Sequence, residues 1–313
     1  CLGTRQEPSG VAEKDISEKI LESYNDVFAD IVNVLLFDGE ELMKPSELED
    51  QAPRSAYKAD GKLREVERDV AKRWKNGSVR IACIGVENQT AIDSLMPLRV
   101  IGYDGAEYRS QYGSAGNKYP VVTFVLYFGT EKEWEKEITL KRCLDIPPEL
   151  EQYVNDYKVN VFSVAYLSPE KVRQFKSDFR IVADYFVQKQ LTQDYIPNPQ
   201  TIEHVQETLQ LLSIMGNDER FEQAYNSSAE GGPRNMCEVL ERIESRGKEI
   251  GKEIGKEIGK AIGKEIGEKI GREEQAKATA ARMQKKGFST YEIAEFIGFS
   301  REQVEKWLKE NNA

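Results

Sequence analysis

The chain has 313 residues, of which 39% are hydrophobic and 31% charged, and its formal net charge is −10 at pH 7. This length suffices for one large domain or two modest ones with a buried core. No apolar run approaches the roughly 20 residues that span a bilayer, and residues 1–20 are polar, so we expect a cytoplasmic protein. The acidic balance argues against a large basic footprint for nucleic acid, although clustered metal-binding carboxylates would also make a chain acidic.

The N-terminal part of the chain predicts a helix followed by a loop. Apolar residues recur at helical spacing over residues 16–37, and Asp38-Gly39 is a turn signal that would end this helix. Residues 40–61 are polar and contain two prolines, which favours a loop.

The central part of the chain predicts strands and a helix in a mixed order. Asn76-Gly77 is a strong hairpin signal between two strand-like stretches. The expected elements are strands over 66–74 and 79–87, a helix over 96–112, strands over 120–128 and 159–167, and helices within 169–226. This order predicts an α/β sandwich.

Composition divides the chain into four segments. We expect a disordered N-terminus (1–15), an α/β domain (16–230), a repetitive helix or linker (231–286) and a helix-turn-helix-like tail (287–313). Gly231, Gly232 and Pro233 mark the end of the α/β domain.

The repeat begins at Gly247 and reads GKEI, GKEI, GKEI, GKAI, GKEI, GEKI. A four-residue period makes the Ile stripe drift about 40° per repeat around an α-helix. Glycine at every fourth position weakens a helix by about 1 kcal/mol per residue relative to alanine. Residues 247–271 are therefore either a partly helical linker or a self-association helix that would make the chain a homo-oligomer.

The tail reads as two short helices joined at Gly298. Ser289 or Thr290 can cap the first helix and Ser300 the second. In a helix-turn-helix, residues 300–309 would form the recognition helix. Its charges nearly cancel, so DNA binding and packing against protein both stay open.

Three side chains around the hairpin form the strongest chemical pattern. Asp69 precedes the turn, and Glu87 and Gln89 follow it on one face of a strand, because residues i and i+2 of a strand point the same way. Adjacent antiparallel strands can bring Asp69 near Glu87. Two converging carboxylates can hold Mg²⁺, which prefers oxygen ligands and activates water. Solvated strand-end charges are the alternative.

Other catalytic classes find little support in the sequence. His204 is the only histidine, which excludes a Ser-His-Asp triad and a site built on several histidines. The four cysteines show no CxxC spacing, so neither zinc nor a disulfide framework is indicated. There is no GxGxxG or Walker loop.

The stretch IGVENQTAIDSLMPLRVIGYDGAEY (84–108) resembles the Rpn-like family of recombination-promoting nucleases and putative transposases. The resemblance continues through YPVVTFVLYFG (119–129) and FKSDFRIVADYF (175–186). It implies a PD-(D/E)XK restriction-endonuclease-like core with a helical C-terminal extension. It also implies a Mg²⁺-dependent DNA endonuclease, with Mn²⁺ as an alternative metal and a link to recombination or DNA mobility.

The family pattern assigns roles to individual residues. Asp69 and Glu87 would be metal ligands, and Gln89 would orient the attacking water in the place where many related nucleases have Lys. Arg99, on the following helix, is a candidate for contacting DNA phosphate. Relatives often carry an acid in the first helix, where this chain has Asn25. Asn25 stays a candidate catalytic residue, because an amide can ligate weakly or form a hydrogen bond. It adds no charge, however, so the alternative is a catalytically degenerate nuclease fold that binds DNA or protein.

Overall fold

The computed structural model describes residues 20–51, 54–59, 62–67, 69–76, 79–112, 115–192, 195–226 and 232–310. Its contacts divide the chain into two compact units, one ending at Ile243 and the next beginning at Glu244. The predicted disordered N-terminus (1–15) and the predicted boundary at residue 231 lie outside the described residues.

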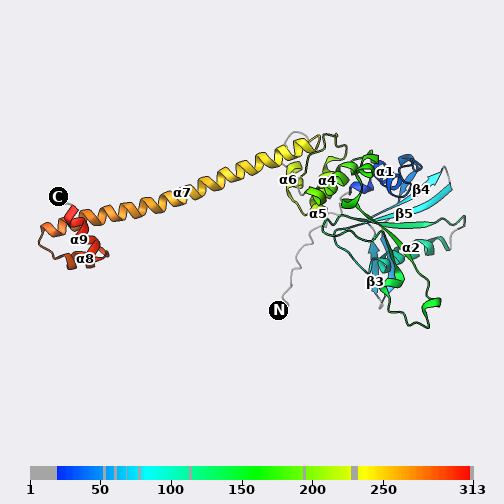
Figure 1. The fold of residues 1–313 in the computed structure, drawn as a ribbon, viewed down its shortest axis with the longest axis horizontal. Coiled ribbons are helices and arrows are strands. Elements are labelled where there is room, and N and C mark those ends of the chain that lie inside the picture. The colour runs from blue at the N-terminus through cyan, green and yellow to red at the C-terminus, as the bar shows by residue number, and fades with distance from the viewer. Residues whose placement is uncertain are drawn as a thin grey trace, which may run out of the picture. The chain divides into compact units, whose positions relative to one another are not determined.

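The first unit is a mixed α/β structure around a six-stranded sheet (Figure 1). Its strands follow the order β1-β4-β5-β6-β8-β7, and β2 and β3 form a separate hairpin. The bounds are β1 Leu48–Asp50, β2 Arg54–Ala59, β3 Lys62–Glu67, β4 Val70–Asn76, β5 Val79–Gln89, β6 Val121–Tyr127, β7 Glu137–Thr139 and β8 Lys158–Ser163. The strands β1, β4 and β5 are antiparallel neighbours, whereas β5, β6 and β8 run parallel.

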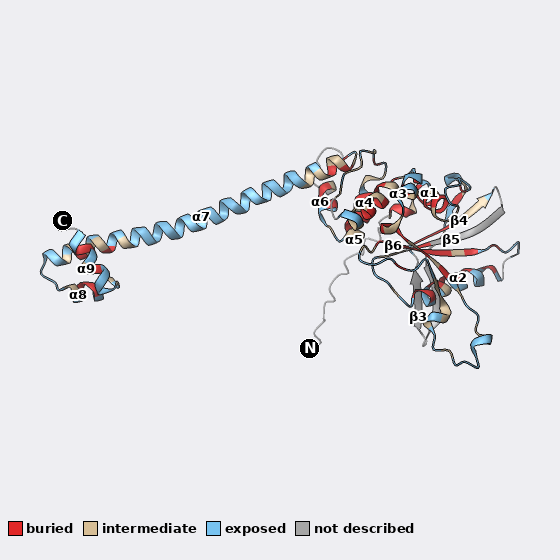
Figure 2. Ribbon diagram, in the orientation of Figure 1, coloured by how far each residue is buried: buried red, intermediate tan, exposed pale blue. Residues whose placement is uncertain are grey.

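The helices of this unit cover both faces of the sheet. Their bounds are α1 Asn25–Leu35, α2 Met96–Tyr112, α3 Pro169–Gln174, α4 Phe179–Thr192, α5 Val205–Gly216 and α6 Arg220–Asn226, with short 3-10 turns at Leu21–Ser23, Pro45–Glu47, Leu140–Cys143, Glu151–Tyr153 and Val164–Tyr166. Helices α1, α4 and α5 share one apolar core with Val86 and Phe124, whereas α2 packs on the opposite face through Met96 and Val100 against Val125 (Figure 2).

Several predicted bounds shift for physical reasons. The helix α1 begins at Asn25, after a 3-10 turn, and the chain reverses at Asp38 and Gly39, both of which have positive φ. The predicted strand over 66–74 is wrong at Asp69, which lies in a bend between β3 and β4. The predicted loop over 40–61 is wrong where β1 and β2 lie; β1 has only three residues, two of them exposed, which is too short a pattern to predict a strand.

The crossover helix α2 has a polar buried face. Asp104 accepts hydrogen bonds from the hydroxyls of Thr123, at 2.5 Å, and Tyr157. Glu107 accepts from the hydroxyl of Tyr119 at 2.7 Å and from the amide of Gln51 at 2.8 Å. Buried polar groups need such partners. The hydrogen bonds of Asp104 and Glu107 therefore hold α2 against the sheet.

The second unit consists of most of α7 (Met236–Lys285) followed by α8 (Thr290–Ile297) and α9 (Arg301–Glu310). The GKEI repeat is helical throughout, and its six isoleucines are each about half exposed, between 47% and 54% (Figure 2). A capping box joins Ser289 to Glu292, and Gly298 ends α8 at a φ of 70°. The two predicted tail helices are confirmed.

The tail helices pack on the end of α7. Ala276 and Ala280 of α7 share a small apolar core with residues of α8 and α9, the largest of which is Trp307. The tail is therefore part of a three-helix arrangement with α7. Among the described helices, none is long and apolar enough to cross a membrane.

Candidate functional site

Asp69 lies in the bend just before β4, and Glu87 lies in the neighbouring strand β5. Val70 pairs with Val86, so the next position in this antiparallel register places Asp69 across from Glu87. The Asp69 carboxylate accepts a hydrogen bond from the backbone N–H of Asn88 at 2.7 Å. The predicted antiparallel pairing is confirmed. The side chain of Glu87 lies outside the described part of the chain.

This pair lies at the edge where the parallel strands β5 and β6 end. Gln89 pairs with Tyr127, and its carbonyl accepts the backbone N–H of Phe128 at 2.8 Å. The Gln89 side chain is partly buried, and strand alternation puts it on the opposite face from Asn88. Binding sites in α/β proteins favour the carboxyl ends of parallel strands.

A hollow of about 430 Å³ opens beside these strand ends. Thr90 and Ile92, which follow β5, line it together with the loop that follows β6, from Phe128 to Lys132. The hollow therefore begins directly after Gln89 and provides space next to the predicted centre.

Glu22 is an acidic residue at this site that the sequence analysis missed. It lies in the 3-10 turn before α1 and is completely buried. Burial raises the pKa of its carboxyl to about 7. Its own backbone N–H and the side chain of Asn88 partly oppose this rise, and the negative charge of Asp69 adds to it. Only the tertiary structure could find Glu22, because residues 20–24 carry no motif.

Asn25, the predicted weak ligand, is held by a buried lysine. Lys72, whose side chain is 1% exposed, donates to Asn25 Oδ1 and to the Ser23 carbonyl, each at 2.6 Å, and also to Asp50. The amide nitrogen of Asn25 donates to the Leu48 carbonyl at 3.3 Å. Both ends of the Asn25 amide are thus used within the fold.

Arg99 lies in the first turn of α2 and is 42% exposed. Its guanidinium donates to the Tyr103 hydroxyl at 3.3 Å and lies 3.8 Å from Asp93. These contacts orient the side chain and leave much of it accessible to solvent.

His204 packs against the start of α1. Its ring stacks on Tyr24 with centroids 3.8 Å apart, and its Nε2 lies 3.0 Å from Asp26 Oδ2. Among the described residues, no group of three or more His, Cys, Asp or Glu side chains could hold a metal ion. The described carboxylates at the candidate site are those of Glu22 and Asp69.

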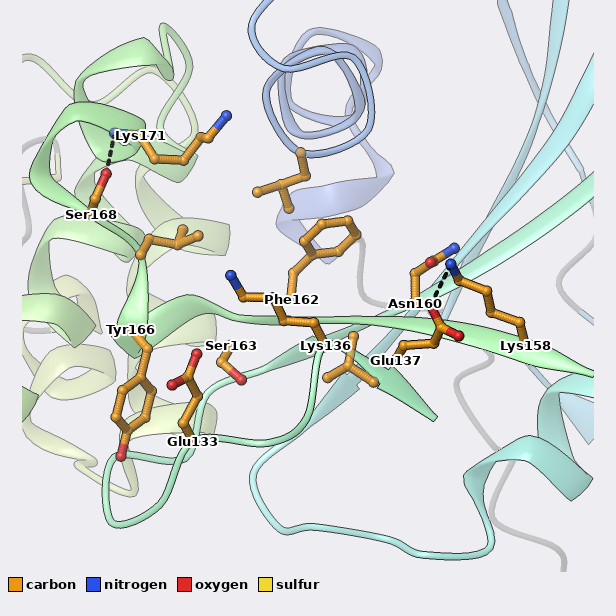
Figure 3. Close-up of a pocket in the computed structure, with 13 residues that line it drawn as sticks. Glu133, Lys136, Glu137, Lys158, Asn160, Phe162, Ser163, Tyr166, Ser168 and Lys171 are labelled. Carbon is orange, nitrogen blue, oxygen red and sulfur yellow. Dashed lines mark hydrogen bonds and ion pairs between the residues drawn. The ribbon is translucent and has the colours of Figure 1, made fainter. Parts of the chain in front are cut away.

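Another hollow, of about 500 Å³, lies along β8 (Figure 3). Lys136 and Glu133 extend into it, and Lys158 pairs with Glu137 at 2.6 Å. Acidic and basic side chains alternate around this hollow, and none of the predicted site residues lines it. It is separate from the candidate site.

Comparison with known proteins identifies one family. A family model described as "Putative transposase, YhgA-like" matches residues 39–220, which is more than half of the chain. The match spans β1 to the start of α6 and includes Asp69, Glu87 and Gln89. No curated protein and no solved structure matches the chain.

Proposed function

The chain belongs to the family of YhgA-like putative transposases, and we propose that it is a Mg²⁺-dependent DNA endonuclease with a PD-(D/E)XK core. The family itself implies interaction with DNA. The observation that carries the finer proposal is the position of Asp69 across from Glu87 at the carboxyl ends of two parallel strands.

The topology supports this core. One helix, three antiparallel strands, a crossover helix and a parallel fourth strand follow one another as α1, β1-β4-β5, α2 and β6. The first helix and the crossover helix cover opposite faces of the sheet. The hairpin of β2 and β3 is an insertion between β1 and β4.

The available side chains fit a hard divalent cation. Glu22 presents buried carboxylate oxygens that have no hydrogen-bond partner of regular geometry among the described residues, and Asp69 is near enough for its charge to act on them. Mg²⁺ prefers oxygen ligands of this kind. Asp69 and Glu87 would hold the ion, with Mn²⁺ as an alternative. When bound, a divalent cation offsets charge on the scissile phosphate and lowers the pKa of water.

The chain's own polar side chains would orient the reactants. Gln89 can align a water molecule through its amide but supplies no positive charge. Arg99, whose side chain is partly accessible at the start of α2, is placed to contact a phosphate of the DNA backbone. The hollow after Gln89 leaves room for a nucleotide beside the centre.

One observation favours a second candidate, a degenerate nuclease fold that binds DNA or protein. Asn25, where relatives often have an acid, is engaged by Lys72 and the Leu48 carbonyl. The two candidates differ in whether the carboxylates act on a phosphodiester bond.

Supercoiled plasmid incubated with the purified chain and Mg²⁺ tests the proposal. We expect nicking that disappears with EDTA, with Glu87→Ala and with Asp69→Asn. Asp26→Asn is the matched control, because Asp26 is an exposed acid that pairs with His204. DNA that is bound but left uncut, in Mg²⁺ and in Mn²⁺, single- or double-stranded, would establish the degenerate module instead.

A further inference from the structure

Glu22 has the features of an acid that lacks a partner. Its relative exposure is 0%, and neither carboxylate oxygen has a hydrogen-bond partner of regular geometry among the described residues. An unpaired buried carboxylate is strongly unfavourable unless a cation or a proton compensates it. Its persistence in a well-packed turn therefore requires such a compensating partner.

The neighbouring charge that raises the pKa of Glu22 further is that of a second acid, Asp69. Asn88 links the two residues, because its backbone N–H donates to Asp69 while its side chain lies beside the Glu22 carboxylate. The side-chain Oδ1 of Asn88 is also buried without a partner in the described structure. Glu22 and Asp69 thus lie near each other where β5 ends, with Asn88 between them, and carboxylate oxygens suit Mg²⁺ or Mn²⁺.

Lys72 is the lysine nearest to Asp69 in the sequence, but its hydrogen bonds go to other groups. Lys72 donates all three of its hydrogen bonds, to the Ser23 carbonyl, Asn25 Oδ1 and Asp50. Two of these acceptors, in Ser23 and Asn25, lie one and three residues after Glu22. Lys72 is therefore a positioning residue that holds the 3-10 turn against β4 and sets the place of Glu22.

We propose that Glu22 is a further carboxylate ligand of the divalent cation, beside Asp69. It would supply the charge that Asn25 lacks, from a position three residues earlier in the chain. This inference rests on the proposed function, because it shares Asp69 and the end of β5 with the predicted centre.

Direct measurement of metal binding tests the role without relying on cleavage. Mn²⁺ is titrated into the full-length chain and free Mn²⁺ is followed by electron paramagnetic resonance. We expect Glu22→Gln to weaken binding by about tenfold or more, since the amide keeps the shape but loses the charge. Asp26→Asn, an exposed acid four residues later, should bind like the wild type. Asn25→Asp should not restore binding to Glu22→Gln, because Lys72 already engages the side chain at that position.

The possible results distinguish the role of Glu22 from the existence of the metal site as a whole. Wild-type affinity in a folded Glu22→Gln chain would overturn the role of Glu22 and leave the proposed nuclease intact. Absence of Mn²⁺ binding by the wild type would overturn the metal site as a whole. Should circular dichroism show that Glu22→Gln is misfolded, Glu22→Asp takes its place, and weaker binding is again expected because the shorter side chain withdraws the carboxylate.

Discussion

The Lys72 ammonium donates a hydrogen bond to the side-chain oxygen of Asn25 at 2.6 Å, inside the core of the first unit. The same ammonium holds the Ser23 carbonyl and Asp50, so one buried charge ties the start of α1 to β4 and β1. This contact explains why Asn25 is an amide in a position where an acid was expected. The amide oxygen accepts a hydrogen bond from Lys72, while the amide nitrogen donates one to the Leu48 carbonyl, which a carboxylate could not do.

Replacing Lys72 with methionine should destabilise the first unit by about 3 kcal/mol. The substitution keeps the packing volume but leaves the Ser23 carbonyl and Asn25 Oδ1 buried without a donor, and each such group costs about 1–3 kcal/mol. Urea unfolding of the full chain measures the change. Asp50→Asn is the control and should lose less than about 1 kcal/mol, because Asp50 is 85% exposed and its ion pair is screened by water. Equal losses in both variants would contradict this account.

Glu22 should make the metal-free protein less stable as the pH rises. Its pKa is about 7 in the folded chain, against an ordinary value of 4.5 for an exposed glutamate, so the folded state binds more protons between these values. The free energy of unfolding therefore falls as the pH rises through this window and stays low above it.

Glu22→Gln should remove that slope. The variant should exceed the wild type at pH 8 by up to about 3 kcal/mol, from about 1.4 kcal/mol per pKa unit, and match it near pH 4.5. Urea unfolding in EDTA at several pH values measures the difference. A constant difference across the range would show that Glu22 does not titrate there.

Arg99→Ala should weaken DNA binding and reduce its dependence on salt. A side chain that contacts one phosphate contributes about one unit to the slope of log affinity against log salt. Fluorescence anisotropy at several salt concentrations, in Ca²⁺ to limit cleavage, gives this slope. Arg109→Ala, at the other end of the same helix, is the matched control. An unchanged slope in Arg99→Ala would assign Arg99 to contacts within the fold, such as those with Tyr103 and Asp93.

Alanine at the repeat glycines should strengthen α7. A Cβ at Gly255 or Gly259 meets nothing within 4 Å, and alanine favours a helix over glycine by about 1 kcal/mol. The double variant Gly255→Ala/Gly259→Ala should raise the thermal midpoint of helix loss seen by circular dichroism. Gly298→Ala should lower it, because Gly298 has a φ of 70° that alanine adopts at a cost. A lower midpoint in the double variant would show that these glycines are needed for contacts between helices of separate chains.

Local patterns in the sequence were sufficient to predict many of the helices and strands. The hairpin at Asn76, the buried strand over 121–127 and the capped tail helices each follow from features within a few residues, such as turn signals, alternation and capping side chains. Short edge strands such as Leu48–Asp50 were missed because one exposed face and three residues carry too little periodicity. The repeat is helical throughout even though its glycines weaken a helix.

The sequence by itself determined the family, the pairing of β4 with β5 and the choice of Asp69, Glu87 and Gln89, because these depend on a contiguous motif and one tight turn. Only the tertiary structure decided what surrounds them. Glu22 and Asn88 meet across 66 positions of chain, and Lys72 reaches Asn25 across 47. The burial that raises the pKa of Glu22, and the hydrogen bonds that engage Asn25, arise from packing α1 against the sheet, which no local pattern encodes.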